Sequence, residues 1–196
     1  MPESPREILL FPLNTVLFPE GVLPLKVFEQ RYIELTKACL RDEAPFGVCL
    51  IREGGEVGAA ALPERVGCLA TIVQWDMPQL GLFHLVARGG RRFRLIETRV
   101  GANQLIAADV ELLPADPVGN EVDALCGGIL KTIIEKAGAG RFPAPLKLDD
   151  ADWVSYRLAE VLPLEGAEKQ ELLEIANAPA RFQRLRQFLA RLGLGA

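Results

Sequence analysis

The highest concentration of positive charge in the sequence is the stretch ARGGRRFRLIETR at residues 87–99. Its five arginines are Arg88, Arg91, Arg92, Arg94 and Arg99. Guanidinium groups bind phosphate and an aromatic ring can stack on a base, so this stretch could bind nucleic acid. On a strand, however, Arg92 and Arg94 would face one way and Phe93 the other, where it could not stack on a base held by the arginines. A solvated strand face is therefore the competing interpretation.

Acid–base or metal chemistry has few candidate residues. His84 is the only histidine, and it lies in the apolar stretch LFHLV, which is typical of a strand. Base catalysis would also need a nucleophile or water placed beside it. Three carboxylates gather at Asp149, Asp150 and Asp152. They could bind a metal ion or form an acid–base pair, but aspartates at a helix start cap free N–H groups and meet the macrodipole, which favours capping.

Motifs for covalent catalysis and for nucleotide binding are missing from the sequence. Neither G-x-x-x-x-G-K-[ST] nor G-x-G-x-x-G after a strand occurs. The two serines, Ser4 and Ser155, lack the strained G-x-S-x-G turn that exposes a nucleophile. The four cysteines are Cys39, Cys49, Cys68 and Cys126, and none of them form a C-x-x-C pair. This pattern is typical of small buried thiols rather than of a zinc site. We therefore expect neither a catalytic site nor a bound cofactor or metal ion.

Composition limits the class of protein further. The chain has 196 residues, of which 49% are hydrophobic and 24% are charged, enough for one large domain or two small ones. Its net charge of −4 does not favour nucleic acid or an anionic membrane as a partner. There is no long uninterrupted apolar run, and the stretch MPESPREILLF lacks the basic segment of a signal peptide. We expect a soluble, cytoplasmic protein.

The first two thirds of the sequence predict short strands that bend around prolines. Apolar segments at 8–11, 16–18 and 22–28 are interrupted by Pro12, Pro19 and Pro24. Since proline donates no ladder hydrogen bond, such strands belong at edges or bulges, which suits a small bent barrel. A helix is expected at about 29–41. Further strands are expected at 46–52, 66–75, 82–87, 92–100 and 104–112, with turns at DMPQLG and RGG.

The stretch PADPVGNE marks the clearest boundary, because prolines and glycine interrupt both strand and helix. We assign residues 1–116 to a β-rich subdomain and 117–196 to a subdomain of four helices, which makes the fold class α+β. Helical periodicity with short connections predicts a bundle. We expect Asn120 to cap the first helix and Asp149 or Asp150 to cap the second. The third helix is expected at about 166–176. Asn177 should begin the last helix and Gly193 should end it.

The stretch FPLNTVLFPEGVLPLKVFEQRY at residues 11–32 resembles the opening of the N-terminal domain of Lon proteases. Later stretches resemble that domain in the same order: PFGVCLIREGGEVG, VGCLATI, GGRRFRL and LPLEGAEKQELLE. The resemblance implies a PUA-like β pseudo-barrel followed by a helical bundle. It also implies a stand-alone domain for recognising substrates or partners, without the ATPase and Ser-Lys peptidase modules of full-length Lon. No catalytic residue can be carried over, since the family places none in this domain.

We therefore expect a non-catalytic module that binds unfolded polypeptide segments or a protein partner in the cytoplasm. A groove between the two subdomains is the expected place. Its candidate lining residues are Pro19, Leu23, Phe28, Arg31, Tyr32 and Trp75. Core packing is the alternative for each of them, above all for Phe28, and Arg31 could instead tie the helix to the barrel. RNA binding through the arginines and a hydrolase built on His84 or the aspartates remain alternatives.

Overall fold

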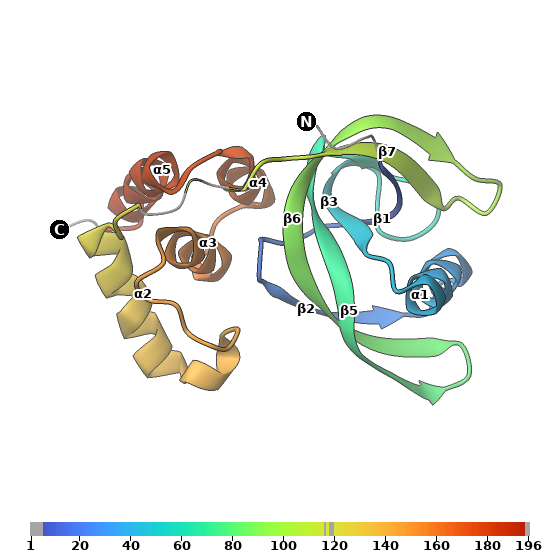
Figure 1. Cartoon of the computed structure of the whole chain (residues 1–196), viewed down its shortest axis with the longest axis horizontal. Helices are drawn as coiled ribbons and strands as arrows, with labels where there is room; N and C mark the ends of the chain where they lie inside the picture. The colour runs from blue at the N-terminus through green and yellow to red at the C-terminus, as the bar shows by residue number, and fades with distance from the viewer. Residues whose placement is uncertain (1–5, 116, 118–119, 195–196) are drawn as a thin grey trace. The chain divides into compact units, whose positions relative to one another are not determined.

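The computed structural model describes residues 6–115, 117 and 120–194. The chain divides into two compact units, Met1–Pro114 and Ala115–Ala196. The first unit contains the strands and the helix α1 (Gln30–Asp42), and the second is built from helices (Figure 1). The sequence thus changes from strand-forming to helix-forming residues where the chain passes from one unit to the other.

The strands of the first unit form a ring. They are β1 (Arg6–Leu13), β2 (Val22–Val27), β3 (Phe46–Glu53), β4 (Leu62–Pro63), β5 (Val66–Gln79), β6 (Leu82–Val100) and β7 (Ile106–Leu112). The order is β1-β7-β6-β5-β3, and β3 pairs back with β1 in parallel register, from Leu10 with Gly47 to Leu13 with Leu50. The short β4 pairs with β3, and β2 pairs with β6 outside the ring. The expected pseudo-barrel is thus a strand ring with extra strands rather than a regular barrel.

The prolines near the N-terminus act differently from the prediction. Pro12 lies inside β1, where it is paired with Cys49. The strand expected at 16–18 is wrong, because these buried residues belong to a loop that passes over β6. In that loop the Glu20 N–H donates to Gly89 O, and the Gly89 N–H donates to Gly21 O, each at 2.8 Å. The loop therefore satisfies its backbone groups on β6 without being a strand.

The strands β5 and β6 are longer than the sequence pattern indicates, and they extend beyond the ring as a hairpin (Figure 1). The turn expected at DMPQLG begins only at Leu80, and Gly81 takes the left-handed φ of 82°. The turn expected at RGG is wrong, because β6 continues through it. A Cβ on Gly89 would lie 2.1 Å from Phe18 O, so this glycine is needed for the close approach of the loop.

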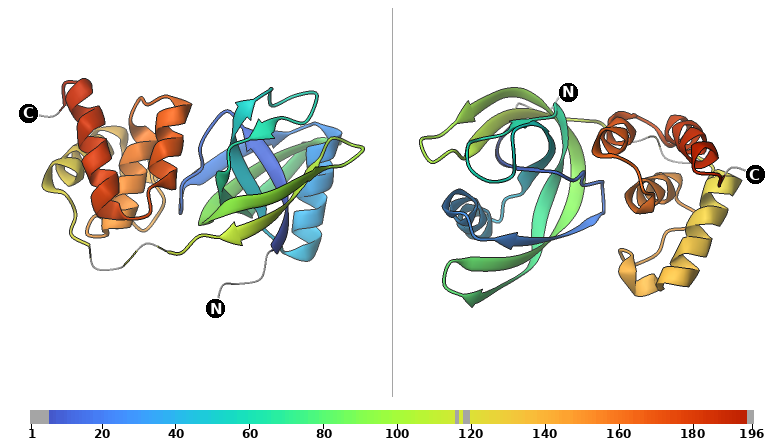
Figure 2. Two further views of the ribbon diagram at one scale, coloured as in Figure 1. Left: turned by 90° about the horizontal axis from the view of Figure 1, so that it is seen from above. Right: turned by 180° about the vertical axis from the view of Figure 1, so that it is seen from behind.

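The helix α1 lies beside the strands of the first unit (Figure 2). Its apolar stripe packs on them. Tyr32, Leu35 and Cys39 are buried at helical spacing and belong to one core cluster with residues of β1, β3, β5 and β6. The helix ends where Glu43 adopts a left-handed φ of 49° and donates its N–H to Cys39 O. This helix lies close to the predicted range of 29–41.

The second unit contains the helices α2 (Ala124–Ala137), η1 (Ala139–Arg141), α3 (Ala151–Val161), α4 (Gly166–Glu174) and α5 (Ala178–Arg191). Asp150 caps α3 by accepting from two backbone N–H groups, and Asn177 caps α5, which confirms both predictions. The cap of α2 is Asp123, so the predicted start at Asn120 is wrong by three residues. The Asn120 side chain instead donates to Pro117 O at 2.8 Å.

A fully buried arginine links α3 to α5 in the second unit. The Arg181 guanidinium donates to Ser155 Oγ at 2.8 Å and to Asp152 Oδ1 at 2.9 Å. It also lies 3.7 Å from the centre of the Tyr156 ring. Since a buried charge is tolerated only when it is paired and hydrogen-bonded, this cluster fixes how the two helices pack.

Candidate functional site

The six residues predicted to line a binding site separate into two groups. Phe28 and Trp75 have 61% and 52% of their surface exposed. Arg31 and Tyr32 are each only 5% exposed, within the body of the first unit. Pro19 and Leu23 are half-buried, and Leu23 packs against the core. Only Phe28 and Trp75 are therefore largely available to a partner.

Arg31 connects α1 to other segments of the first unit. Its guanidinium donates to Glu56 O at 3.0 Å and to Gln104 O at 3.3 Å, and it lies 3.3 Å from the Glu29 carboxylate. These contacts tie α1 to two distant loops. The Tyr32 ring stacks on Phe11 with ring centres 3.9 Å apart, and burial raises the pKa of its hydroxyl above the usual value. Both side chains are buried, which favours the structural alternative that the sequence left open for them.

Exposed apolar side chains gather where β2, β6 and β5 extend past the ring. We call this three-stranded region, residues 22–28 and 72–88, the hairpin platform (Figure 1). Its large exposed apolar residues include Phe28, Val73, Trp75, Met77 and Leu80. Leu80, at the turn, is 94% exposed. Exposed apolar residues concentrated in one place mark an interaction surface more often than scattered ones do.

The platform is anchored in the core through one aromatic contact. The ring centres of Trp75 and Phe83 lie 6.0 Å apart with planes tilted by 47°, and Phe83 is 5% exposed. Phe83 pairs across the strands with Val27, which directly precedes Phe28. Phe28 and Trp75, which are 47 positions apart in the sequence, thus lie on either side of the same strand end.

A shallow cavity of about 590 Å³ lies on the platform. It is lined by Pro24, Leu25, Lys26, Gln74, Trp75, Asp76, His84, Leu85 and Val86. The lining residues include both apolar and charged types. A cavity of this size can accept one or two amino-acid side chains, and its apolar area favours burial of a large apolar group.

The edges of the platform are poorly suited to pairing with another strand. Within the described residues β2 pairs only with β6, and its free edge contains Pro24, which has no N–H to donate. On the opposite side β5 contains Pro78 and register shifts between Ile72 and Gln74 and between Asp76 and Gln79. Bulges and prolines blunt sheet edges. These edges therefore disfavour the addition of another strand.

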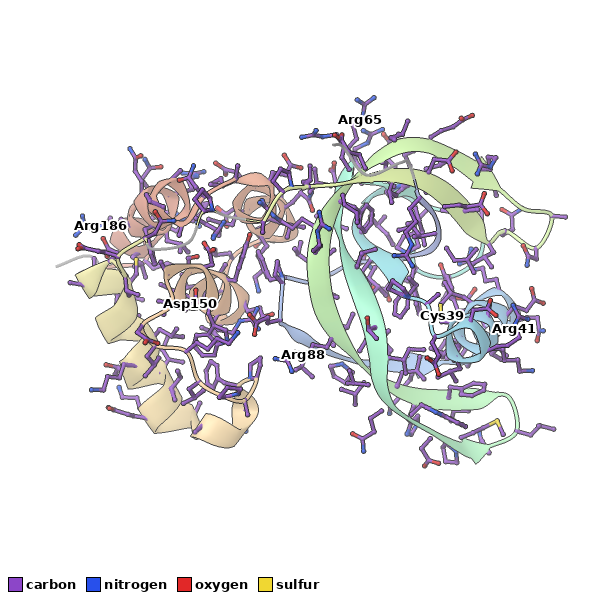
Figure 3. All side chains as sticks on the ribbon, viewed as in Figure 1. Cys39, Arg41, Arg65, Arg88, Asp150 and Arg186 are labelled. Atoms are coloured by element: carbon purple, nitrogen blue, oxygen red, sulfur yellow. The ribbon has the colours of Figure 1, made fainter. Side chains whose placement is uncertain are left out.

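The arginine stretch lies on one continuous strand rather than on a hairpin. Arg88 pairs with Glu20 at 3.4 Å, Arg94 with Glu111 at 3.7 Å, and Arg99 with Asp109 at 2.7 Å. Figure 3 labels Arg88 among the side chains of β6. Hydrogen bonds from Arg99 hold the pKa of the Asp109 carboxyl below its usual value. These carboxylates offset much of the positive charge that a phosphate backbone would require.

One predicted exposure in this stretch is wrong. Arg92 was expected on the exposed face opposite Phe93, but Arg92 is 5% exposed and Phe93 fully buried. The pairing shifts from Cys68 with Arg92 to Ala70 with Gly89, so β6 contains an extra residue at this point. The bulge precedes Arg92, and Arg92 and Arg94 pair regularly with Cys68 and Val66, so they still face the same side of the sheet. Because Arg92 is buried, it is not available to a ligand beside Arg94.

The residues considered for acid–base chemistry are divided between the two units. Asp150 caps α3 and Asp152 pairs with Arg181, while His84 belongs to the other unit on an exposed strand face. Among the described residues no group of three or more His, Cys, Asp and Glu side chains is placed to bind a metal ion. Burial raises the pKa of the Cys39 thiol to about 11 and that of Cys126 to about 12. Such thiols carry almost no thiolate at neutral pH.

Comparison with known proteins identifies the family of this chain. Residues 7–191 match the family model described as the substrate-binding domain of the ATP-dependent protease La (LON). The chain belongs to this family. The Lon proteases of Anaeromyxobacter dehalogenans and Paraburkholderia phytofirmans are 32% and 29% identical to it over 96% and 94% of its length. The chain spans only 24% of the length of each of these two relatives.

Solved structures give the same family assignment for the fold. The crystal structure of a Lon N-terminal domain protein from Xanthomonas campestris superimposes with a TM-score of 0.75 and is 34% identical, covering 92% of this chain and 96% of that one. The N-terminal domain of a Mycobacterium avium complex Lon protease gives a TM-score of 0.66 at 17% identity and supports the fold alone. Within the described part of this chain, every helix is too short or too polar to span a bilayer.

Three exposed residues of the platform were missed from the sequence. Val73, Met77 and Leu80 lie in or beside stretches that were assigned to a strand end and a turn. One signal was available, since Met77 and Leu80 are large apolar residues in a segment where a turn usually has polar ones. Their shared location could not be seen without the true length of β5.

Proposed function

We propose that this chain is a non-catalytic module that binds unfolded polypeptide segments through the side chains of the hairpin platform. The observation that carries the proposal is the concentration of exposed apolar side chains there, led by Phe28 and Trp75. The substrate-binding family to which the chain belongs supports it. The site lies within the first unit, because both exposed candidates are found there.

The chemistry of the platform suits a partner without fixed structure. Aromatic and thioether side chains adapt to varied apolar groups, as Trp75 and Met77 would here. An unfolded segment can place one or two of its side chains in the cavity of about 590 Å³ without unfolding a domain. Since the blunted strand edges disfavour backbone pairing, affinity should depend on apolar content rather than on one sequence. No cofactor and no nucleic acid takes part in the proposal.

A fluorescence anisotropy titration tests this function. A labelled, permanently unfolded polypeptide is titrated with the wild-type chain and with the double variant Phe28→Ser/Trp75→Ser. Ile96→Ser/Val100→Ser is the matched control, because these residues are 57% and 56% exposed elsewhere on the first unit. We expect binding that survives moderate salt, a loss of about tenfold or more for the platform variant, and little change for the control. Equal affinities for all three proteins would refute the proposed site.

A further inference from the structure

Three charged or titratable side chains form a row across the hairpin platform. Lys26 of β2 is the register partner of His84 on β6, and His84 is the register partner of Asp76 on β5. Residues directly opposite one another in antiparallel strands face the same side of the sheet. All three are exposed, and all three line the cavity. The row thus has a cation at one end, an anion at the other and an imidazole between them.

The charges at the two ends of this row are not neutralised within the described part of the chain. There Lys26 forms no ion pair, and the Asp76 carboxylate accepts a hydrogen bond only from the Met77 N–H, at 2.8 Å. Arginines elsewhere on β6 are paired, as Arg88 is with Glu20 and Arg94 is with Glu111. The platform therefore differs from the rest of the strand in leaving charges of both signs available to a partner.

The spacing of the row determines how far apart the charged residues of that partner must be. Neighbouring strands lie about 4.8 Å apart, so two strand spacings separate Lys26 from Asp76 by about 10 Å between their Cα atoms. An extended polypeptide advances about 3.3 Å per residue. A segment crossing the strands would thus meet both charges with residues about three positions apart. An apolar side chain between them would enter the cavity beside Pro24 and Val86, which face the same side of the sheet as the row.

We propose that the hairpin platform prefers polypeptide segments in which an acidic and a basic residue, about three positions apart, flank a large apolar side chain. This inference rests on the proposed function and names its substrate class. The acidic residue faces Lys26 and the basic residue faces Asp76. Because the segment can lie in either direction, the preference concerns the presence of both charges and not their order. His84 lies between them and offers a ring nitrogen for a hydrogen bond to the segment.

Three labelled peptides with the same apolar centre test the preference. One has an acidic and a basic flank, one has two basic flanks and one has two acidic flanks. We expect the wild-type chain to bind the mixed peptide about threefold to tenfold more tightly than the others, a difference typical of exposed charge pairs. Lys26→Glu should shift the preference to the doubly basic peptide and Asp76→Lys to the doubly acidic one. The double variant Lys26→Glu/Asp76→Lys should restore the preference for the mixed peptide.

The control is Lys37→Glu, which reverses the charge of an exposed residue on α1 and should leave the wild-type order unchanged. A preference that weakens with salt while apolar affinity persists would support the row as its source. Equal binding of all three peptides, or preferences that do not switch with the variants, would overturn this inference alone. Failure of all three peptides to bind would overturn it together with the proposed function.

Discussion

Trp75 and Phe83 pack with their ring centres 6.0 Å apart, although Phe83 is buried and half of Trp75 faces solvent. One aromatic pair thereby joins the core of the first unit to its most exposed apolar region. A binding side chain that is supported from below keeps its rotamer and loses little entropy on binding. This support distinguishes Trp75 from Leu80, which is 94% exposed at the turn of the hairpin.

Gly89 should tolerate no larger residue. A Cβ there would lie 2.1 Å from Phe18 O, a backbone atom that cannot move without disturbing the hydrogen bonds to Glu20 and Gly21. We expect Gly89→Ala to lower the free energy of unfolding by about 2–3 kcal/mol, the cost of forced overpacking. Urea denaturation measures the loss. The neighbouring Gly90→Ala is the control, because its nearest contact would be an ordinary 3.6 Å, and an equal loss in both variants would argue against this explanation.

Arg31 should matter for stability rather than for binding. Replacing it with alanine removes the hydrogen bonds to Glu56 O and Gln104 O and leaves both carbonyl groups without this donor. We expect a loss of about 2–4 kcal/mol in the free energy of unfolding. Arg41→Ala on the same helix should cost almost nothing, since the Arg41 side chain is 73% exposed and pairs with its neighbour Asp42. Figure 3 labels Arg41 on α1.

The binding measurement separates the two possible roles of Arg31. Under conditions where Arg31→Ala remains folded, its affinity for unfolded polypeptide should equal that of the wild type. A variant that is fully folded but no longer binds would show instead that Arg31 contributes to the site, as the sequence allowed.

Much of the fold follows from local patterns in the sequence. The stripe of α1 and the caps Asp150 and Asn177 each depend on a few neighbouring positions. Periodicity and capping report such short-range features well. The same is true of the order of strands first and helices afterwards.

The structural features that the sequence did not predict share a different cause, which is contact between distant segments. The stretch RGG was interpreted as a turn because glycine usually marks one, whereas Gly89 is required by a loop about 70 residues earlier in the chain. Arg31 is buried because its partners lie at Glu56 and Gln104. Core packing was the favoured alternative for the candidate Phe28, yet this residue is 61% exposed and follows a strand that lies outside the ring. None of these partners can be identified from local sequence.

The stability of the second unit should depend on pH through Glu160. Burial raises the pKa of this carboxyl from 4.5 to about 7, although Arg157 and Lys169 act in the opposite direction. Between these two values the folded chain holds a proton that the unfolded chain releases, so the free energy of unfolding falls as pH rises from about 4.5 to about 7. Below this window Glu160 is protonated in both the folded and the unfolded chain, so its burial costs no stability. Above it Glu160 is ionised in both states, and the full cost of burying its charge lowers the free energy of unfolding.

Chemical denaturation at a series of pH values measures this dependence. Glu160→Gln should flatten the fall across the window, and Glu135→Gln, at an exposed position of α2, should leave it unchanged. A wild-type chain whose stability stays level or rises over this range would contradict the assigned protonation of Glu160.

The most direct test of the account uses Trp75 as its own reporter. The chain has two tryptophans, and Trp153 is 3% exposed with an indole N–H that has no hydrogen-bond partner in the described structure, so Trp153→Phe should be tolerated. Trp75 then supplies all tryptophan emission. Titration with a labelled, tryptophan-free unfolded polypeptide should shift this emission to shorter wavelength and saturate together with the anisotropy of the label. Saturating anisotropy with unchanged Trp75 emission would show that the polypeptide binds elsewhere and would contradict the hairpin platform as the site.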